Sequence, residues 1–152
     1  MANQKSGPNS RHIRDVMTAN PECVTSKDSI QDVARIMKNQ DTGVVPVVDG
    51  KKIIGLVTDR DIVVRGIAEG RSLNDLRVNE IMTKSVRTVR EDADVNDVLR
   101  TMSNAEIRRV PVVNQNDELV GIVSIGDIAT NTNQSGKIGQ AMEDISEAPP
   151  NN

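Results

Sequence analysis

The sequence predicts an α/β fold, of the α+β kind, in which two pseudo-symmetric β-α-β-β-α repeats pack sheet to sheet. Three observations lead to it: the length of the chain, an internal repeat, and the same order of helical and strand patterns in both halves. The chain has 152 residues, enough for one compact domain but not for two ordinary independent ones. It holds no Phe, Tyr or Trp, so aliphatic residues and Met must build the core.

The second half of the chain repeats the first at a shift of 65 residues. The matched positions include Met17 on Met82, Thr18 on Thr83, Val24 on Val89, Arg35 on Arg100, Met37 on Met102, and Val45–Val48 on Val110–Val113. One extra residue in the turn at 114–117 changes the shift to 66, which places Gly55 on Gly121 and Asp61 on Asp127. Identities at such spaced positions indicate a duplication.

Each copy opens with helical elements. Ile13, Val16 and Met17 stand at helical spacing, and a short extended piece at Cys23–Val24 follows. The next segment predicts an amphipathic helix, and its apolar positions are Ile30, Val33, Ala34 and Met37 in the first copy and Val95, Val98, Leu99 and Met102 in the second. Ser26, Asp28 and Ser29 are candidates for the N-cap of the first of these helices.

Two strands and a second helix complete each copy. Residues 44–48 form the first strand, and Pro46 inside it favours an edge position or a strand end. Asp49–Gly50 predicts a hairpin turn into a strand at 53–57. From Asp59 onward, apolar residues at helical spacing predict a helix.

The repeat sets the expected boundaries. We expect a flexible N-terminal arm at 1–12, repeat 1 at 13–72, a linker at 73–77, repeat 2 at 78–137, and a polar, partly disordered tail at 138–152. Within the tail, Ile138, Met142 and Ile145 are candidates for one apolar stripe on a short helix.

Composition excludes several function classes. The chain has 19 basic and 22 acidic residues and a net charge of −3, which argues against nucleic acid or an anionic membrane as the main partner. It offers no aromatic ring on which bases can stack. No apolar run approaches the length of a membrane span and no signal peptide is recognisable. A single Cys and a single His predict a cytoplasmic protein without a zinc site of its own.

The sequence predicts no enzyme. The one histidine, His12, lies in the N-terminal arm, so no Ser/His/Asp set has a plausible base. Neither a dinucleotide-binding glycine motif nor a P-loop is present. We therefore assign no catalytic residue, no metal ligand and no required cofactor.

One short motif recurs at the same place in both copies. A strand ends at a hydroxyl residue and an aspartate follows three positions later, as Thr58 with Asp61 and Ser124 with Asp127. This spacing is typical of a capping box, in which the two side chains bond to each other's backbone. A second interpretation is that the hydroxyl faces a phosphate and the carboxylate accepts hydrogen bonds from a ribose diol. The two interpretations are compatible.

An arginine pair distinguishes the second copy. Arg108 and Arg109 precede its first strand, where the first copy has Gly43 and Val44. The fold therefore does not require these arginines. Guanidinium groups are preferred for bidentate recognition of phosphate, and the alternative is a surface ion pair with Glu106 or Asp41, which contributes little.

Together these residues resemble the cystathionine β-synthase (CBS) domain. The likeness rests on Met-Thr, an amphipathic helix, the strand around Pro46 or Pro111, and the Gly-strand-hydroxyl-Asp segment, and it covers roughly 13–129. Two such domains in tandem resemble a CBS pair, or Bateman module, as a stand-alone prokaryotic protein. The resemblance implies a cleft between the repeats that binds AMP, ADP, ATP, NAD(H) or S-adenosylmethionine.

The resemblance also implies roles for individual residues. Ribose would be held by Asp127 and Asp61, and phosphate would be faced by Arg108, Arg109, Ser124, Thr58 and Arg60. The adenine pocket of the Asp127 site would be lined by Thr18, Val24, Ile122 and Gly126. The adenine pocket of the Asp61 site would be lined by Leu56, Thr83 and Val86. Since Gly43 and Val44 replace the arginine pair, Asp127 marks the better site for a multiply charged phosphate.

The function implied is a non-catalytic sensor that signals through a conformational or dimer change. We expect a homodimer, with the helices around 30–37 and 95–102 as candidate faces, and a protein partner that the sequence does not identify. The alternative is a nucleotide-free module for protein–protein interaction or dimerisation, in which the capping boxes are only caps. A nucleic-acid-binding regulator is a third hypothesis, against which the acidic composition argues.

Overall fold

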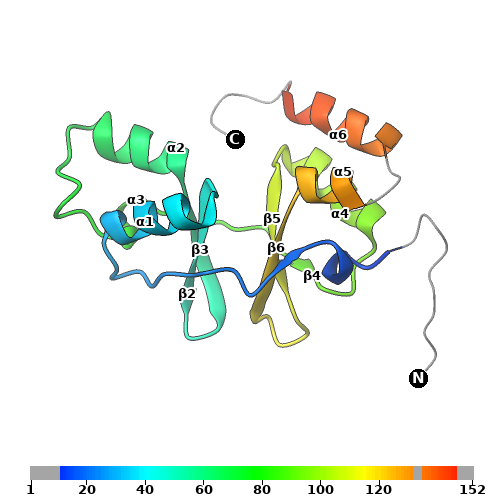
Figure 1. Ribbon diagram of the computed structural model, residues 1–152, viewed down its shortest axis with the longest axis horizontal. Helices are drawn as coiled ribbons and strands as arrows, with labels where there is room; N and C mark the ends of the chain where they lie inside the picture. The colour runs from blue at the N-terminus through cyan, green and yellow to red at the C-terminus, as the bar shows by residue number, and fades with distance from the viewer. Residues whose placement is uncertain (1–10, 132–134, 147–152) are drawn as a thin grey trace. The chain divides into compact units, whose positions relative to one another are not determined.

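The computed structural model describes residues 11–131 and 135–146, which form an α+β fold of two compact units (Figure 1). Unit 1 comprises the described parts of Met1–Ala19, Arg87–Asn116 and Val120–Asn152, and unit 2 comprises Asn20–Val86 and Asp117–Leu119. Each unit has its own cluster of buried aliphatic residues. The predicted fold class is therefore confirmed.

Unit 2 is built around one hairpin. Its elements are α1 (Ile30–Gln40), β2 (Val44–Asp49), β3 (Lys52–Thr58), α2 (Asp59–Asp61), the π-helix η2 (Ile62–Ile67) and α3 (Val78–Ile81). The strands pair antiparallel, and Gly50 in the turn between them has φ +63°, a conformation that glycine adopts freely. The hairpin predicted from Asp49–Gly50 is confirmed.

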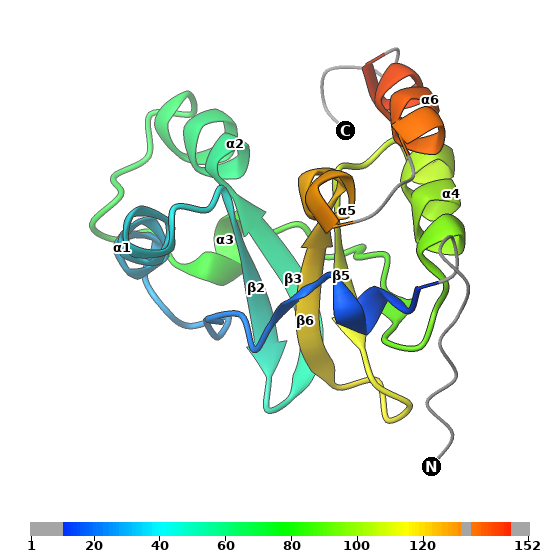
Figure 2. The ribbon, with the colours of Figure 1, turned by 45° about the vertical axis from the view of Figure 1, so that its right-hand side comes forward.

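Unit 1 has the same plan with additions (Figure 2). Its elements are the 3₁₀-helix η1 (Ile13–Asp15), β1 (Thr18–Ala19), β4 (Val89–Arg90), α4 (Val95–Ala105), β5 (Arg109–Val113), β6 (Leu119–Ser124), α5 (Ile125–Asn131) and α6 (Ser135–Ser146). The four strands form one sheet in the order β1-β6-β5-β4. Helix α6 packs against α4 and α5.

Both long amphipathic helices form where predicted. Ser29 caps α1, and its hydroxyl accepts a hydrogen bond of 3.1 Å from the Asp32 backbone N–H. Helix α1 ends at Asp41 and α4 at Glu106, both in the left-handed conformation with φ of 51° and 58°. These two residues occupy equivalent positions of the repeat, so the cap geometry belongs to the shared fold.

The segments that begin the repeats are exchanged between the units. Ile13 and Val16 of repeat 1 lie in the core of unit 1, which otherwise holds repeat 2. Val78 and Ile81 of repeat 2 lie in the core of unit 2. We call 13–18 and 78–83 the leading segments. The boundaries of the sequence repeats therefore differ from those of the compact units.

Two glycines make room for the leading segments. A Cβ on Gly55 would lie 2.8 Å from the Thr83 carbonyl oxygen and 2.9 Å from the Met82 sulfur. In the other unit a Cβ on Gly121 would meet the Met17 sulfur and the Thr18 carbonyl oxygen. Glycine at these strand positions therefore lets the Met-Thr backbone approach closely.

The parts predicted as linker and tail carry core residues. Leu76, inside the expected linker, is 2% exposed, and its carbonyl accepts a hydrogen bond from the Ile30 N–H. In α6 the buried residues are Ala141 and Ile145, whereas Met142 is 38% exposed. The predicted stripe is therefore wrong at Met142; the Ile138 side chain lies outside the described residues, as do residues 1–10 of the predicted arm and 147–152 of the predicted tail.

Pro46 lies within β2, an edge strand of its two-stranded sheet, as predicted. On the outer side of β2, the Val24 N–H donates to the Pro46 carbonyl, and the Val48 N–H donates to the Val24 carbonyl. Proline has no N–H to continue this ladder, so the extended piece at Val24 pairs over one bridge only.

The faces proposed for a dimer are buried inside the units. Ile30 and Val33 of α1 and Val95, Val98, Leu99 and Met102 of α4 are at most 3% exposed. These apolar stripes form the cores of their own units, because a small unit has few other apolar surfaces to bury. These stripes are therefore unavailable to a second copy, whereas contact through the exposed sides of the two helices stays a prediction. Among the described residues, the large hydrophobics that are exposed are Val63, Val64, Ile67 and Met142.

Candidate functional site

Ser124 and Asp127 form a reciprocal pair at the start of α5 in unit 1. The Ser124 N–H donates to Asp127 Oδ2 at 2.9 Å, and the Asp127 N–H donates to Ser124 Oγ at 3.0 Å. This is the capping box that the spacing predicts. Within the described residues, Asp127 Oδ1 makes no hydrogen bond or ion pair, so a half-buried carboxylate keeps one oxygen for an outside donor.

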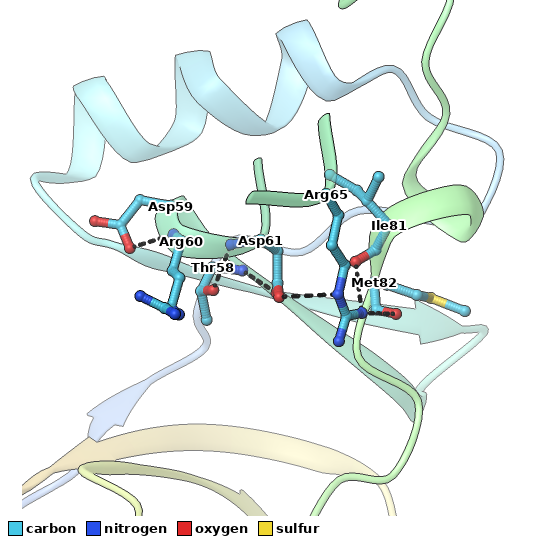
Figure 3. Close-up of polar contacts among 7 residues, drawn as sticks. All are labelled: Thr58, Asp59, Arg60, Asp61, Arg65, Ile81 and Met82. Atoms are coloured by element: carbon cyan, nitrogen blue, oxygen red, sulfur yellow. Dashed lines mark hydrogen bonds and ion pairs between the residues drawn. The ribbon is translucent and has the colours of Figure 1, made fainter. Parts of the chain in front are cut away.

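Thr58 and Asp61 form the matching pair in unit 2 (Figure 3). The Thr58 N–H donates to Asp61 Oδ2 at 2.9 Å, and the Asp61 N–H donates to Thr58 Oγ1 at 3.1 Å. Here the other carboxylate oxygen, Oδ1, lies 3.9 Å from Arg65 Nε. Arg65 also donates to the carbonyls of Ile81 and Met82 at 3.2 and 3.3 Å.

The arginine pair of unit 1 lies beside the Ser124–Asp127 turn. The Ile125 N–H donates to the Arg108 carbonyl at 2.9 Å, which joins the start of β5 to the start of α5. Both arginine side chains are exposed. Among the described residues neither forms an ion pair, so the alternative of a pair with Glu106 or Asp41 does not hold here.

The structure brings several predicted pocket residues together within each unit. Thr18 of β1 lies opposite Ile122 of β6 in unit 1. In unit 2, Leu56 and Thr83 exchange backbone hydrogen bonds of 3.0 and 2.8 Å. The partly buried Val86 follows in the same unit. The leading segment therefore crosses the strand that ends at the hydroxyl–Asp motif in both units.

Val24 is the exception among the predicted pocket residues. We expected it beside Asp127, but it belongs to unit 2 and is 4% exposed in that unit's core. Its backbone pairs with β2 at Val47. Val24 therefore belongs to a different compact unit from Asp127, and its grouping with the Asp127 site stays a prediction.

Gly126 and Arg60 occupy equivalent positions at the starts of the two helices. Gly126 is exposed in the first turn of α5. The Arg60 N–H donates to Asp59 Oδ1 at 2.9 Å. The phosphate and ribose roles of all these residues stay predictions.

Sequence reasoning missed two features of unit 2. The pairing of Asp61 with Arg65 has a visible signal, since the residues stand four apart on a helix. The carboxylate of Asp59 lies over Gly43, and no sequence pattern that we considered joins these two positions. Asp59 stands at the position of Ile125, and Gly43 at the position of Arg108. Unit 2 therefore has a negative charge near the place where unit 1 has a positive one.

Cys23 is half-buried in unit 2 beside the extended piece at Val24. Its thiol donates to the Pro21 carbonyl at 3.1 Å. Burial raises the pKa of the Cys23 thiol, and the nearby negative charge of Glu22 raises that pKa further. The thiol therefore stays protonated at neutral pH.

No cluster of three or more His, Cys, Asp or Glu side chains suited to a metal ion occurs in the part of the chain that the structure describes. None of the described helices has the length and apolar character that crossing a membrane demands.

Three known proteins show what this chain is similar to. YlbB of Bacillus subtilis (strain 168) is 40% identical over 137 residues, which are 89% of this chain and 91% of that protein. The CBS domain pair of MJ0100, in complex with 5′-methylthioadenosine and S-adenosyl-L-methionine, is 32% identical with a TM-score of 0.68, over 80% of this chain and 94% of that one. CBSX2 in complex with AMP is 25% identical with a TM-score of 0.67, over 78% and 93%.

The family model of the CBS domain matches the sequence twice. The matches cover residues 13–66 and 78–131, so one match falls within each of the two predicted repeats. Each match includes one leading segment and one hydroxyl–Asp capping box. The chain therefore belongs to the CBS-domain family, as a tandem pair of CBS domains.

Proposed function

We propose that the protein is a non-catalytic sensor module that binds an adenosine-containing ligand and signals by a change of conformation or of its dimer. The candidate ligands are AMP, ADP, ATP, NAD(H) and S-adenosylmethionine. Two CBS pairs of similar structure are complexes with adenosine compounds, which supports the ligand class for this chain.

One observation carries the proposal. The hydrogen bond from the Ile125 N–H to the Arg108 carbonyl brings an exposed arginine pair, which forms no ion pair within the described residues, to the turn that holds Asp127. Two guanidinium groups suit a phosphate. Asp127 Oδ1, for which the described part of the chain supplies no donor, suits the two hydroxyls of a ribose. The same turn thus combines a donor set for phosphate with an acceptor for sugar.

Calorimetric titration of AMP, ADP, ATP, NADH and S-adenosylmethionine tests the proposal. The Arg108→Ala, Arg109→Ala double variant removes two exposed side chains that form no ion pair with any residue the structure describes, so its fold is expected to persist. Arg100→Ala is the matched control, because Arg100 is an exposed arginine that pairs only with Asp97 on its own helix. We expect the double variant to lose the heat of a phosphorylated ligand and the control to keep it.

Absence of heat with all five compounds, in protein shown to carry no co-purified ligand, would refute the sensor function. The alternative of a nucleotide-free interaction module would then replace it. A bound ligand also raises thermal stability by RT ln(1 + [L]/Kd), so a dye-based melting assay checks the calorimetry independently.

The proposed assembly is a homodimer, and Val63, Val64 and Ile67 of η2 are the proposed contact. Their exposed fractions are 53%, 41% and 54%. The equivalent helix α5 has Ala129 and Thr130 where η2 has Val63 and Val64, so the fold does not require apolar residues there. A second copy related by a two-fold axis presents the same apolar side chains and buries both sets at once.

Light scattering after size exclusion tests this assembly. The wild-type chain is expected at twice its mass of 16.5 kDa, and Ile67→Glu at the monomer mass. Met142→Glu, also at an exposed apolar residue but on α6, is expected to leave the dimer intact. A monomeric wild type would refute the dimer, and a dimeric Ile67→Glu would refute this contact.

A further inference from the structure

The two candidate sites differ in charge at one equivalent position. In unit 1 the Ile125 N–H donates to the Arg108 carbonyl at 2.9 Å, and in unit 2 the Asp59 N–H donates to the Gly43 carbonyl at 3.0 Å. These two hydrogen bonds are the same contact in the repeated fold. Gly43 thus replaces Arg108, and Asp59 replaces Ile125.

The Asp59 carboxylate occupies the place where a side chain at 43 would begin. A Cβ built on Gly43 would lie 2.9 Å from Asp59 Oδ2 and 3.3 Å from Oδ1. In unit 1 the Arg108 side chain leaves the backbone at this place. Figure 3 shows the Asp59 carboxylate pointing away from Asp61, toward the other end of the turn. A negative group therefore stands in unit 2 where a positive group stands in unit 1.

The surroundings do not reverse this difference. Asp59 is exposed, and the hydrogen bond that its Oδ1 accepts comes from an uncharged group, the Arg60 backbone N–H. Asp61 is paired with Arg65. The turn of unit 2 thus combines the positive side chains of Arg60 and Arg65 with the negative side chains of Asp59 and Asp61. The turn of unit 1 combines Arg108 and Arg109 with the single carboxylate of Asp127 at the equivalent positions. A phosphate group is attracted to the unit 1 turn and gains nothing at the unit 2 turn.

We propose that the unit 2 site takes an adenosine compound whose 5′ substituent is a neutral thioether or a cationic sulfonium, that the unit 1 site takes a phosphorylated one, and that Asp59 sets this selectivity. The inference rests on the proposed function, since it assigns ligand classes to the two sites named there. It assigns a specificity-determining role to Asp59. A carboxylate attracts a sulfonium, tolerates a thioether and repels a phosphate dianion.

Calorimetry with AMP, 5′-methylthioadenosine and S-adenosylmethionine tests the assignment. Wild-type protein is expected to bind one AMP per chain. The Arg108→Ala, Arg109→Ala double variant is expected to lose that AMP and still bind the thioether and the sulfonium. Asp59→Asn keeps the shape of the side chain and the oxygen that accepts the Arg60 N–H. This variant is expected to bind a second AMP per chain, or to bind AMP about tenfold more tightly at unit 2. Its affinity for S-adenosylmethionine is expected to fall about tenfold. Asp97→Asn, at an exposed aspartate on α4, is the charge-matched control and is expected to change neither ligand.

The outcomes separate this inference from the proposed function. If AMP fills both sites of the wild type with equal affinity, or Asp59→Asn alters no ligand, the role of Asp59 is refuted while adenosine binding stands. If none of the three compounds binds, adenosine binding itself is refuted and the selectivity falls with it.

Discussion

Arg65 Nε lies 3.9 Å from Asp61 Oδ1, one helical turn along the chain, and the same guanidinium donates to the carbonyls of Ile81, the last residue of α3, and of Met82. Asn131 holds the equivalent position in unit 1, and its amide donates to the Asp127 backbone carbonyl instead of approaching the carboxylate. Arg65 thus links the capping box of unit 2 to a leading segment, and unit 1 has no arginine at this position.

Replacement of Arg65 is expected to destabilise the protein. Arg65→Ala removes an ion pair to a carboxylate whose side chain is 11% exposed, together with two hydrogen bonds to backbone carbonyls. We expect a loss of about 1 kcal/mol in the free energy of unfolding, measured by urea denaturation. Arg100→Ala breaks a pair whose partners are 68% and 61% exposed, and its effect is expected to fall within the error of the measurement. Equal effects of the two variants would show that the Arg65 contacts add no stability.

Alanine at Gly55 is expected to push the Met-Thr backbone away from β3. The added Cβ would lie 2.8 Å from the Thr83 carbonyl oxygen. This oxygen accepts the Leu56 N–H and the Thr83 N–H donates to the Leu56 carbonyl, so the Thr83 backbone cannot move without loss of these hydrogen bonds. Gly55→Ala should lower the stability by about 1–3 kcal/mol. Gly139→Ala is the control, because its Cβ meets nothing within 4 Å in α6 and alanine favours a helix by about 0.5–1 kcal/mol. A thermal melt that shifts both variants the same way would contradict the close approach.

Glycine at position 41 is expected to stabilise the protein. Asp41 ends α1 with φ +51°, a conformation that costs a non-glycine residue about 1 kcal/mol. Asp41→Gly removes this cost at an exposed position and should raise the midpoint of chemical denaturation. Asp97→Gly, in the first turn of α4, should lower the midpoint, since glycine weakens a helix interior. A fall with Asp41→Gly would show that the Asp41 side chain matters more than its backbone conformation.

Glu80 is expected to make the free energy of unfolding depend on pH in the acidic range. The hydrogen bond from the Arg77 backbone N–H, at 2.8 Å, lowers the pKa of the Glu80 carboxyl, and the positive charge of Arg71 lowers the pKa further. Because the Glu80 pKa is lower in the folded than in the unfolded chain, ionised Glu80 stabilises the fold at pH values above the ordinary Glu pKa. This contribution disappears as the pH falls through the pKa of the folded state.

Urea denaturation of wild type and Glu80→Gln across acidic and neutral pH measures this effect. The wild type is expected to exceed the variant at neutral pH and to approach it in acid. A stability difference that stays constant over the whole range would contradict the assigned pKa shift, while titration of the Glu80 carboxyl by NMR reports the pKa itself.

The repeat made most of the fold predictable from the sequence. Because Val45–Val48 and Val110–Val113 match in both pattern and place, the strands, the long helices and the capping boxes at Asp61 and Asp127 follow from local chemistry. The exchange of the leading segments did not, since Met17-Thr18 and Met82-Thr83 are identical pairs and fit either Gly55 or Gly121 equally well. Only the path of the chain decides between them.

Some features of the candidate site could likewise be predicted from the sequence, and others could not. The arginine pair was visible because Gly43 and Val44 lack it in the first copy. The carboxylate of Asp59 over Gly43 was not visible, since sixteen positions separate the two residues and a backbone hydrogen bond brings them together. The burial of the apolar stripes of α1 and α4 inside their own units could not be predicted, because an amphipathic pattern alone does not distinguish a stripe that covers a core from one that contacts a partner.

The exchanged leading segments bear on how such a chain can arise. In this chain each core is completed by the leading segment of the other copy, since Ile13 and Val16 serve the unit made mainly from repeat 2. Two molecules with a single repeat each would make the same contacts by exchanging their leading segments, which is domain swapping. Fusion of two such genes would link the swapped dimer covalently. The two copies could then differ in sequence, as they do at Gly43 and Arg108, and remain associated.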